Sequence, residues 1–270
     1  MTDPTYERQI AALVRAYQKA IKAILGELDR LDIAYLSRAN SAAALIEVTK
    51  ILTELNKESA QWVSDNIPIA AREGVLTTLV SLDVKDATKV AAFNKINREM
   101  VKAAVADTQA DLLAVTKNVE RRVRTAVRQV TAESMRANLA KGVNGRKTIS
   151  RDILDGLRKK LGDSVNSGIV DAAGRRWKPE VYVEMVTRTK LAETHREAAM
   201  NEAIGRGALY ARISRHGATD ACQLWEGRII KLTPDAPGDY PYIGDLPRRQ
   251  IFHPRCRHTI TPIRDPANAF

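Results

Sequence analysis

The chain has 270 residues, of which 44% are hydrophobic and 28% charged, and its formal net charge is +11 at pH 7. These proportions are typical of a folded protein with a sizeable core. At 5% aromatic residues, wide stacking platforms for single-stranded nucleic acid are not expected. The N-terminus lacks the basic and apolar regions of a secretory signal, and no apolar run suits a membrane span. Two cysteines make no disulfide framework, so we expect synthesis in a reducing cytoplasm.

Charge and proline are both distributed unevenly along the chain. Residues 1–100 hold 13 basic and 13 acidic residues, whereas residues 101–270 hold 30 basic and 19 acidic residues. Seven of the ten prolines lie in the last 37 residues, and none lies between Pro68 and Pro179. Because proline interrupts helices, this distribution predicts a helical chain that ends in loops and strands.

Apolar residues in steps of three and four predict helices throughout residues 1–88, the expected N-terminal helical region. One amphipathic helix is expected over residues 10–31. A second is expected from about residue 40 to the residue before Pro68, and a third from Pro68 to about residue 80. Proline disfavours a helix interior but suits the first helical turn, which is why the boundary is placed there.

Residues 89–145 form the second expected region. No glycine or proline occurs from Lys89 to Leu139, but the apolar stripe weakens around Asp107, Thr108 and Asp111. The pattern predicts either one long helix or a pair of helices broken near residue 108. Fifty helical residues would span about 75 Å, more than the width of a compact domain of this size. We therefore expect an extended stalk or interaction helix, with a helix bent back into a bundle as the alternative.

Residues 146–270 form the third expected region, a C-terminal module. It begins with a short helix near residues 153–161, then a loop that contains Gly168, Gly174 and Arg176, and then a longer helix from Pro179 to about residue 203. Strands are expected at 209–214 and 228–232, followed by a loop of about 20 residues and an end motif at 251–263. The predicted fold class is mainly α: long helices, then a small α+β module with short strands.

Four side chains of this module form a candidate zinc site: Cys222, His253, Cys256 and His258. Zinc favours tetrahedral sulfur and imidazole ligands, often one pair close in sequence with remote partners. Such a site would be structural, since four protein ligands leave no open position for catalysis. Two alternatives remain: free cysteines packed as small hydrophobic residues beside exposed histidines, or a Cys222–Cys256 disulfide. His216 and Asp220 are reserve ligands.

Clusters of basic residues are candidate contacts to nucleic acid or to an acidic partner. Basic patches hold phosphates without reading base sequence, and no sequence-reading motif accompanies these. The alternative is a solvated helix face with salt bridges. No phosphate loop or nucleophile elbow is present, so we expect no enzyme. The residues are Arg121, Arg124, Arg128, Arg146, Lys147, Arg248 and Arg249.

Two segments, His216–Gly227 and Ile251–His258, resemble the C-terminal module of tailed-phage minor capsid (head morphogenesis) proteins. This group includes the Mu F-like and SPP1 minor-head-like proteins. The resemblance extends over about residues 165–263 and includes the Arg188-Thr189 pair. Thr219 stands where many relatives have a cysteine, and His258 stands in place of the second cysteine of a Cys-x-Cys pair. The Cys/His set nevertheless keeps four candidate ligands.

The resemblance implies a structural component of the virion, present in several copies at the portal vertex or inner head surface. It also implies assistance in head assembly, the portal protein and major capsid protein as partners, and packaged double-stranded DNA as a further candidate partner. The protein would be made in the host cytoplasm, without membrane association. The alternative function is a non-sequence-specific nucleic-acid-binding protein that uses the charge of residues 101–270 directly.

Overall fold

The computed structural model describes residues 6–144, 151–166, 169–170 and 174–267. The chain divides into two compact units, which are described separately below. Unit 1 consists of Met1–Ile10, Trp62–Gln109 and Met185–Phe270. Unit 2 consists of Ala11–Gln61 and Ala110–Glu184.

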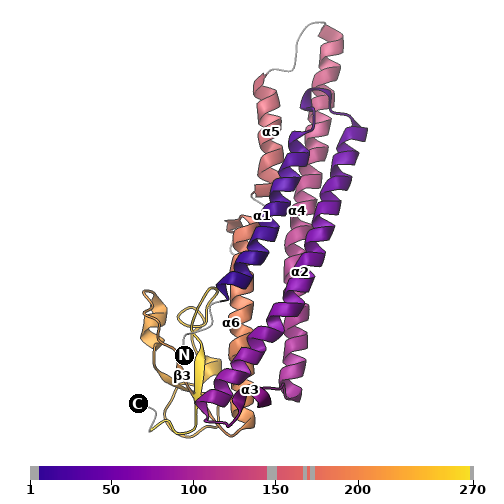
Figure 1. The fold of residues 1–270 in the computed structure, drawn as a ribbon. Coiled ribbons are helices and arrows are strands. Elements are labelled where there is room, and N and C mark those ends of the chain that lie inside the picture. The colour runs from indigo at the N-terminus through magenta and orange to yellow at the C-terminus, as the bar shows by residue number, and fades with distance from the viewer. Residues whose placement is uncertain (1–5, 145–150, 167–168, 171–173, 268–270) are drawn as a thin grey trace. The chain divides into compact units, whose positions relative to one another are not determined.

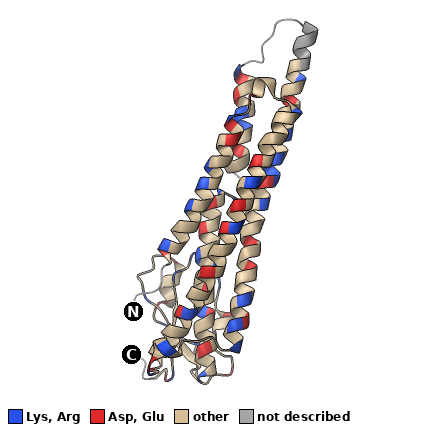
Figure 2. Ribbon diagram, turned by 45° about the vertical axis from the view of Figure 1, so that its right-hand side comes forward, with Lys and Arg blue, Asp and Glu red and all other residues tan. Residues whose placement is uncertain are grey.

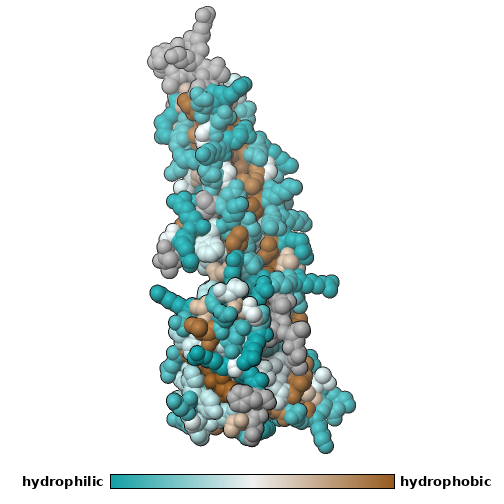
Figure 3. Space-filling view, turned by 90° about the vertical axis from the view of Figure 1, so that its left-hand side faces the viewer, coloured by the Kyte–Doolittle hydropathy of each residue, from teal (hydrophilic) through white to brown (hydrophobic). Residues whose placement is uncertain are grey.

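Most of the described residues before residue 206 are α-helical (Figure 1). The helices are α1 (Glu7–Asp29), α2 (Arg38–Ser81), α3 (Ala87–Val90), α4 (Lys95–Asn144), α5 (Arg151–Asn166) and α6 (Pro179–Gly205). Short 3-10 turns lie at η1 (Ile33–Tyr35), η2 (Ala221–Trp225) and η3 (Ile243–Asp245). No helix in the described part of the chain combines the length and apolarity that a membrane span requires. In Figure 3 the visible surface is mostly hydrophilic, with hydrophobic side chains in separate patches.

Unit 2 is a helical bundle in which α1, α2, α4 and α5 run side by side (Figure 1). The apolar stripes predicted for α1 and for this part of α4 are mostly buried, whereas the apolar Ile46 of α2 is exposed. The buried core of the bundle includes Leu13, Ile24 and Leu28 of α1, Val48 and Leu52 of α2, Leu112, Val119, Val123, Val127 and Val130 of α4, and Leu161 and Val165 of α5. A two-stranded antiparallel ladder of β1 (Ile169–Val170) and β2 (Arg176–Trp177) also belongs to this unit.

Polar side chains fix the register between the helices of this bundle. Ser41 and Thr131 share a buried hydrogen bond of 2.7 Å. The Ser134 hydroxyl donates to the Ile33 carbonyl at 2.6 Å, which ties η1 to α4. These bonds tie α2 and η1 to α4 and so favour this pairing of the helices.

The helical part of unit 1 is held by apolar packing and by bonds to the α6 backbone. A small core joins α2, α3, α4 and α6, and it is formed by Ala71, Val75, Leu79, Ala91, Val101 and Ala198. The Thr78 hydroxyl donates to the Ala199 carbonyl at 3.0 Å, and the Asn97 amide donates to the Ala198 carbonyl at 3.3 Å. These bonds hold α2 and α4 against the same turn of α6.

The rest of unit 1 is a small module around a three-stranded antiparallel sheet. The strands are β3 (Tyr210–Ile213), β4 (Ile229–Lys231) and β5 (Ile260–Ile263), in the order β4-β3-β5. Ile213 at the end of β3 pairs with Ile260 at the start of β5. The loop that leaves β3 and the loop that enters β5 therefore meet at one end of the sheet.

The fold class predicted from the sequence is confirmed: the chain is mainly helical and ends in a small region of short strands. The strands β3 and β4 lie inside the two segments expected to be extended. The β1–β2 ladder lies in a segment that was expected to be a loop. Strands of two residues carry no periodic signal, so sequence alone does not find them.

The helix boundary predicted at Pro68 is wrong, because α2 continues through Pro68 to Ser81. An interior proline removes one backbone hydrogen bond and costs about 3 kcal/mol. Val63, Ile67 and Ala71 flank it and are each fully buried. Burial of apolar side chains on both sides offsets that cost, at about 1.5–3 kcal/mol for each large one.

The helix α4 is continuous from Lys95 to Asn144 and shows no break near residue 108. Thr108 is fully buried, and its hydroxyl donates to the Ala104 carbonyl at 2.6 Å. The weak point of the apolar stripe is thus a satisfied polar residue and not a helix end. Within unit 2, the buried valines of α4 pack inside a helical bundle, so this part of α4 is not a free stalk, although α4 itself continues without a break.

Candidate metal centre and basic groove

The Cys/His cluster lies where the β3–β4 connection meets the segment that enters β5. Cys222 lies on η2, and Asp220 immediately precedes this turn. The Asp220 carboxylate accepts a hydrogen bond of 3.0 Å from the Cys222 backbone N–H and so caps this turn. His253, Cys256 and His258 arrive from the segment before β5. The antiparallel pairing of β3 and β5 therefore brings together residues more than thirty positions apart.

Three of the four predicted ligands form one compact triad. The ligand atoms of Cys222, His253 and Cys256 all lie within 4.8 Å of one another. The Cys222 Sγ is 3.0 Å from the His253 Nε2 and 3.8 Å from the Cys256 Sγ. Both cysteines are buried, and neither forms a disulfide.

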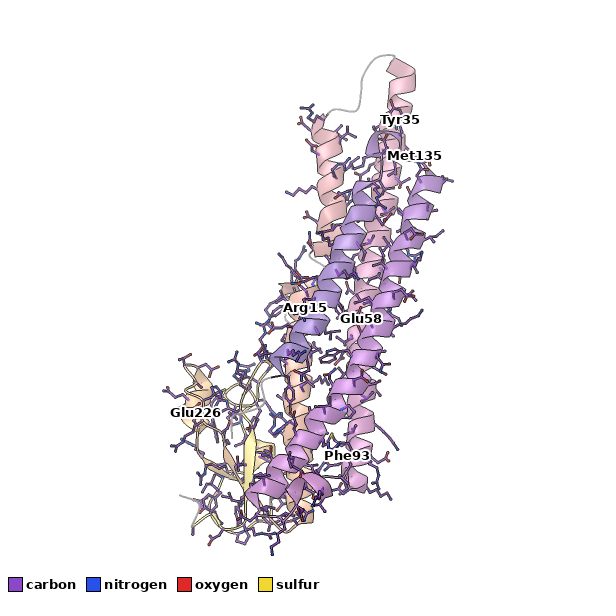
Figure 4. All side chains as sticks on the ribbon, in the orientation of Figure 1. Arg15, Tyr35, Glu58, Phe93, Met135 and Glu226 are labelled. Atoms are coloured by element: carbon purple, nitrogen blue, oxygen red, sulfur yellow. The ribbon has the colours of Figure 1, made fainter. Side chains whose placement is uncertain are left out.

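The fourth predicted ligand, His258, joins a second triad with His216 and Glu226. The His258 Nδ1 is 3.3 Å from the His216 Nε2, and its Nε2 is 3.3 Å from a Glu226 oxygen. The same His258 Nδ1 is 3.4 Å from the Cys256 Sγ, so it stands between the two triads. Figure 4 labels Glu226, which lies in the region of short strands.

Glu226 organises the loop that carries His216. One carboxylate oxygen accepts backbone hydrogen bonds from His216 at 3.0 Å and from Ala218 at 2.9 Å. These two bonds, aided by the nearby His258, lower the pKa of Glu226 to about 2. The carboxylate is therefore an anion at neutral pH, and it holds the loop in place.

The environment of Cys222 disfavours a thiolate in the absence of a cation. Burial is the main cause that raises the pKa of its thiol, and the neighbouring Cys256 sulfur and the Asp220 carboxylate add to it. A bound metal cation would lower the pKa of the Cys222 thiol, because metals bind the deprotonated form.

The donor set and its spacing fit a zinc ion. Two sulfurs at about 2.3 Å from a tetrahedral zinc lie about 3.8 Å apart, which is the separation of Cys222 and Cys256. Two thiols and one imidazole are soft or borderline ligands, the type that zinc prefers over magnesium or calcium. Asp220, named as a reserve ligand, has a carboxylate oxygen 3.4 Å from the His253 Nε2.

A basic groove lies in unit 2 between α4 and α5. It has a volume of about 740 Å³, and Arg121, Arg122, Lys159, Lys160 and Arg176 line it together with the single acidic residue Asp163. Positive and negative side chains are otherwise mixed along the helices (Figure 2). The groove is a site at which five basic side chains converge on one concave surface.

The groove gathers only part of the basic set predicted from the sequence. Arg121 lines it, whereas Arg124 pairs with Glu120 at 2.8 Å and Arg128 is exposed outside it. Arg146 and Lys147 lie outside the described residues. Arg248 and Arg249 are exposed residues of unit 1.

The site also contains residues that sequence reasoning did not assign. Glu226 was read only as part of a motif, because its contact with His258, 32 residues further along the chain, follows from the tertiary fold. Arg176 lies on β2, in a segment expected to be a loop, and its place in the groove follows from the tertiary fold alone.

A comparison with protein-family models identifies a relationship over most of the chain. Residues 37–265 match the model of phage minor capsid protein 2. The chain belongs to the phage minor capsid protein 2 family. This membership confirms the resemblance to phage minor capsid proteins, and it supports a structural role in the capsid of a bacteriophage and a location in the virion. Comparisons with curated proteins and with solved structures give no match.

Proposed function

We propose that this minor capsid protein is a structural, non-enzymatic component of a tailed-phage head, located at the portal vertex or inner head surface. The observation that carries the proposal is the family match over residues 37–265. Several copies per virion would contact the portal protein and the major capsid protein and assist head assembly. Long helices with interhelical polar bonds, such as the Ser41–Thr131 pair, suit a rigid structural element.

The location can be tested by mass spectrometry of purified procapsids and virions, with copy number measured against the major capsid protein. Cross-linking before disruption should join this chain to the portal protein. The absence of the chain from both particles would contradict the proposal.

We infer that the C-terminal module holds a structural zinc ion through Cys222, His253 and Cys256, with His258 as the fourth ligand. When bound, zinc supplies a tetrahedral cross-link between the β3–β4 connection and the segment before β5. The two cysteines and His253 already lie within reach of one ion, and Glu226 orients His258 through its Nε2. The module already has a hydrophobic core, and such a cross-link would add to its stability.

Elemental analysis of the purified full chain tests the metal site. Near-stoichiometric zinc is expected in the wild type and in a His216→Ala variant, and a loss of zinc in Cys256→Ala and His258→Ala. His216→Ala is the matched control because it removes an imidazole from the second triad and leaves the proposed ligands in place. A metal-free wild type that keeps its thermal stability in chelator would refute the site.

We further propose that the basic groove of unit 2 contacts packaged double-stranded DNA. Five basic residues line the groove, although Lys160 also pairs with Glu133 at 2.7 Å. The DNA backbone carries one phosphate charge per about 1.7 Å of helix axis, so a groove of this kind binds it without reading sequence. This groove also favours the alternative function, a nucleic-acid-binding protein that acts outside the capsid.

A salt titration of DNA binding tests the groove. Binding by the wild type should weaken steeply with added salt, and Arg121→Gln/Lys159→Gln should lower the slope of log K against log salt by about 1.8. The control Lys19→Gln/Lys22→Gln removes the same charge from exposed positions of α1 and should leave the slope unchanged. An equal fall in the slope for both variants would show that DNA binding depends on net charge alone and not on the groove. DNA binding by a protein that is absent from virions would favour the alternative function.

A further inference from the structure

A second pocket lies within unit 1, and none of the four proposed zinc ligands lines it. Its volume is about 600 Å³, and α6 supplies one wall while the segments around η3 and before β5 supply the others. Met200, Tyr242 and Phe252 contribute apolar surface, and Arg196 and Arg248 contribute charge. Pockets of about 300–1,000 Å³ with apolar walls and a few polar groups are typical of ligand sites.

Arg196 is the unusual residue of this pocket. Its exposed fraction is 7%, so it is more than nine-tenths buried. Its guanidinium lies over the Phe252 ring, 4.1 Å from the ring centroid. Among the residues that the structure describes, no hydrogen bond or ion pair satisfies this guanidinium. Its nitrogen atoms are not among the fully enclosed, unpaired atoms of the described residues, so they are open to the pocket, where an anion can pair with them.

The neighbouring charges do not supply that partner. Glu193 and Glu197 also line the pocket, but neither carboxylate lies within 4.0 Å of the guanidinium. Glu197 is exposed and Glu193 is half-buried, so both lie nearer to solvent than Arg196. Burial lowers the pKa of Arg196 to about 10, and Glu193 only partly opposes this shift. The guanidinium thus stays charged at neutral pH and lacks an anion.

We propose that this pocket binds an acidic side chain carried on an apolar segment of a partner protein in the virion. The carboxylate would pair with Arg196, because a planar guanidinium matches a carboxylate with two parallel hydrogen bonds. The flanking apolar side chains would pack on Met200, Tyr242 and Phe252. A buried hot spot of this kind, an arginine with aromatic neighbours, is the usual centre of a protein interface.

The geometry favours a protein over DNA as the occupant. DNA phosphates lie on a broad convex surface and are bound by exposed basic side chains, as in the groove of unit 2. Arg196 is buried in the wall of a pocket that also has apolar side chains, where a single side chain can reach it more readily than a duplex can. The inference rests on the proposed function, because it takes the partner from the proteins of the virion.

The first test separates a binding role of Arg196 from a structural role. Arg196→Met removes the charge and keeps a long apolar side chain over Phe252. We expect the purified variant to melt at the same temperature as the wild type or higher, and its incorporation into virions to fall at least tenfold. The control Arg72→Met removes an exposed arginine of the same unit and should be incorporated normally.

Incorporation of Arg196→Met into virions at the wild-type level would overturn the inference. Lower incorporation together with a lower melting temperature would also overturn it, because it would indicate a structural role of Arg196. Absence of the wild-type protein itself from virions would contradict the proposed function instead. The two failures are therefore distinguishable.

The second test identifies the occupant. A photoreactive phenylalanine derivative replaces Ile243, a partly buried residue that lines the pocket, in phage-infected cells. Mass spectrometry should find a cross-link to an acidic, apolar peptide of another virion protein. The same group at Val80, which is 42% exposed in unit 1, is the control and should not join that peptide. Cross-links from position 243 to DNA alone, to this chain alone, or to nothing would overturn the inference.

Discussion

Gly74 of α2 lies directly against the backbone carbonyl of His195 of α6. A Cβ built on Gly74 would overlap that carbonyl oxygen and also contact the backbone nitrogen of Ala199. One turn away, the Thr78 hydroxyl donates to the Ala199 carbonyl. The two helices therefore cross in unit 1 at a point where only a glycine allows the backbones to meet.

This crossing predicts that Gly74→Ala destabilises the protein. In a free helix the change would be favourable by about 1 kcal/mol, but here the new methyl group meets backbone that cannot move aside. We expect a net loss of about 1–3 kcal/mol. Gly26→Ala is the control, since no atom lies within 4 Å of its Cβ, and it should be neutral or stabilising. Urea denaturation of both variants measures the difference, and equal midpoints would contradict the prediction.

In contrast to Gly74→Ala, the substitution Pro68→Ala is expected to stabilise the protein. Alanine at this position restores a backbone N–H to the interior of α2 and removes the clash of the ring with the preceding turn. Proline also restricts the unfolded chain, worth about 0.4–1 kcal/mol, so the expected net gain in stability is about 2 kcal/mol. A higher melting temperature of Pro68→Ala would agree. A lower one would show that the ring itself is needed where it packs.

The buried hydroxyl pair of Ser41 and Thr131 predicts strong coupling between two positions of unit 2. Ser41→Ala and Thr131→Val each remove this bond, while the remaining hydroxyl keeps its bond to the carbonyl four residues earlier, so each should cost about 0.5–1.5 kcal/mol. The double variant should cost less than the sum, by about 0.5–1.5 kcal/mol. A double-mutant cycle, with stability measured by urea denaturation, gives this interaction energy between the two positions. Strict additivity would mean that the pair does not contribute as a unit.

The ion pair between Glu7 and Arg188 predicts a pH dependence. The Arg188 guanidinium donates to both Glu7 oxygens, at 2.7 and 2.8 Å, and this bonding lowers the pKa of Glu7 below its usual range. A lowered pKa in the folded state adds stability above the ordinary glutamate pKa of about 4.3, and the contribution disappears as the pH falls through the folded value. Glu7 is half exposed, so solvent screening limits the pair to about 0.5 kcal/mol.

The measurement compares the wild type with Glu7→Gln in urea at pH 7 and at pH 3. The variant should be less stable at pH 7, and the difference should shrink at pH 3. Glu54→Gln removes a more exposed partner, that of Lys57, and should have a smaller effect. A difference for Glu7→Gln that grows towards acid would contradict the assignment.

The candidate site was partly predictable because its residue types are chemically specific. Two cysteines and two histidines near a proline-rich C-terminus indicated a metal site, and the structure brings Cys222, His253 and Cys256 within reach of one ion. The role of His258 was not predictable in the same way. Its Nδ1 lies near both Cys256 and His216, whereas its Nε2 lies near Glu226, and these contacts depend on the tertiary fold.

Sequence by itself determined the class of the fold, since helical periodicity up to residue 205 and short alternating segments after it are local properties. It also determined where charge and metal-type ligands are concentrated. Only the tertiary structure decided that α2 continues through Pro68, because that outcome depends on burial of Val63 and Ile67 before it and of Ala71 after it. It likewise decided that Arg196 is buried without an anion. The sequence does not indicate whether a charged side chain is buried, because burial depends on the segments that fold over it.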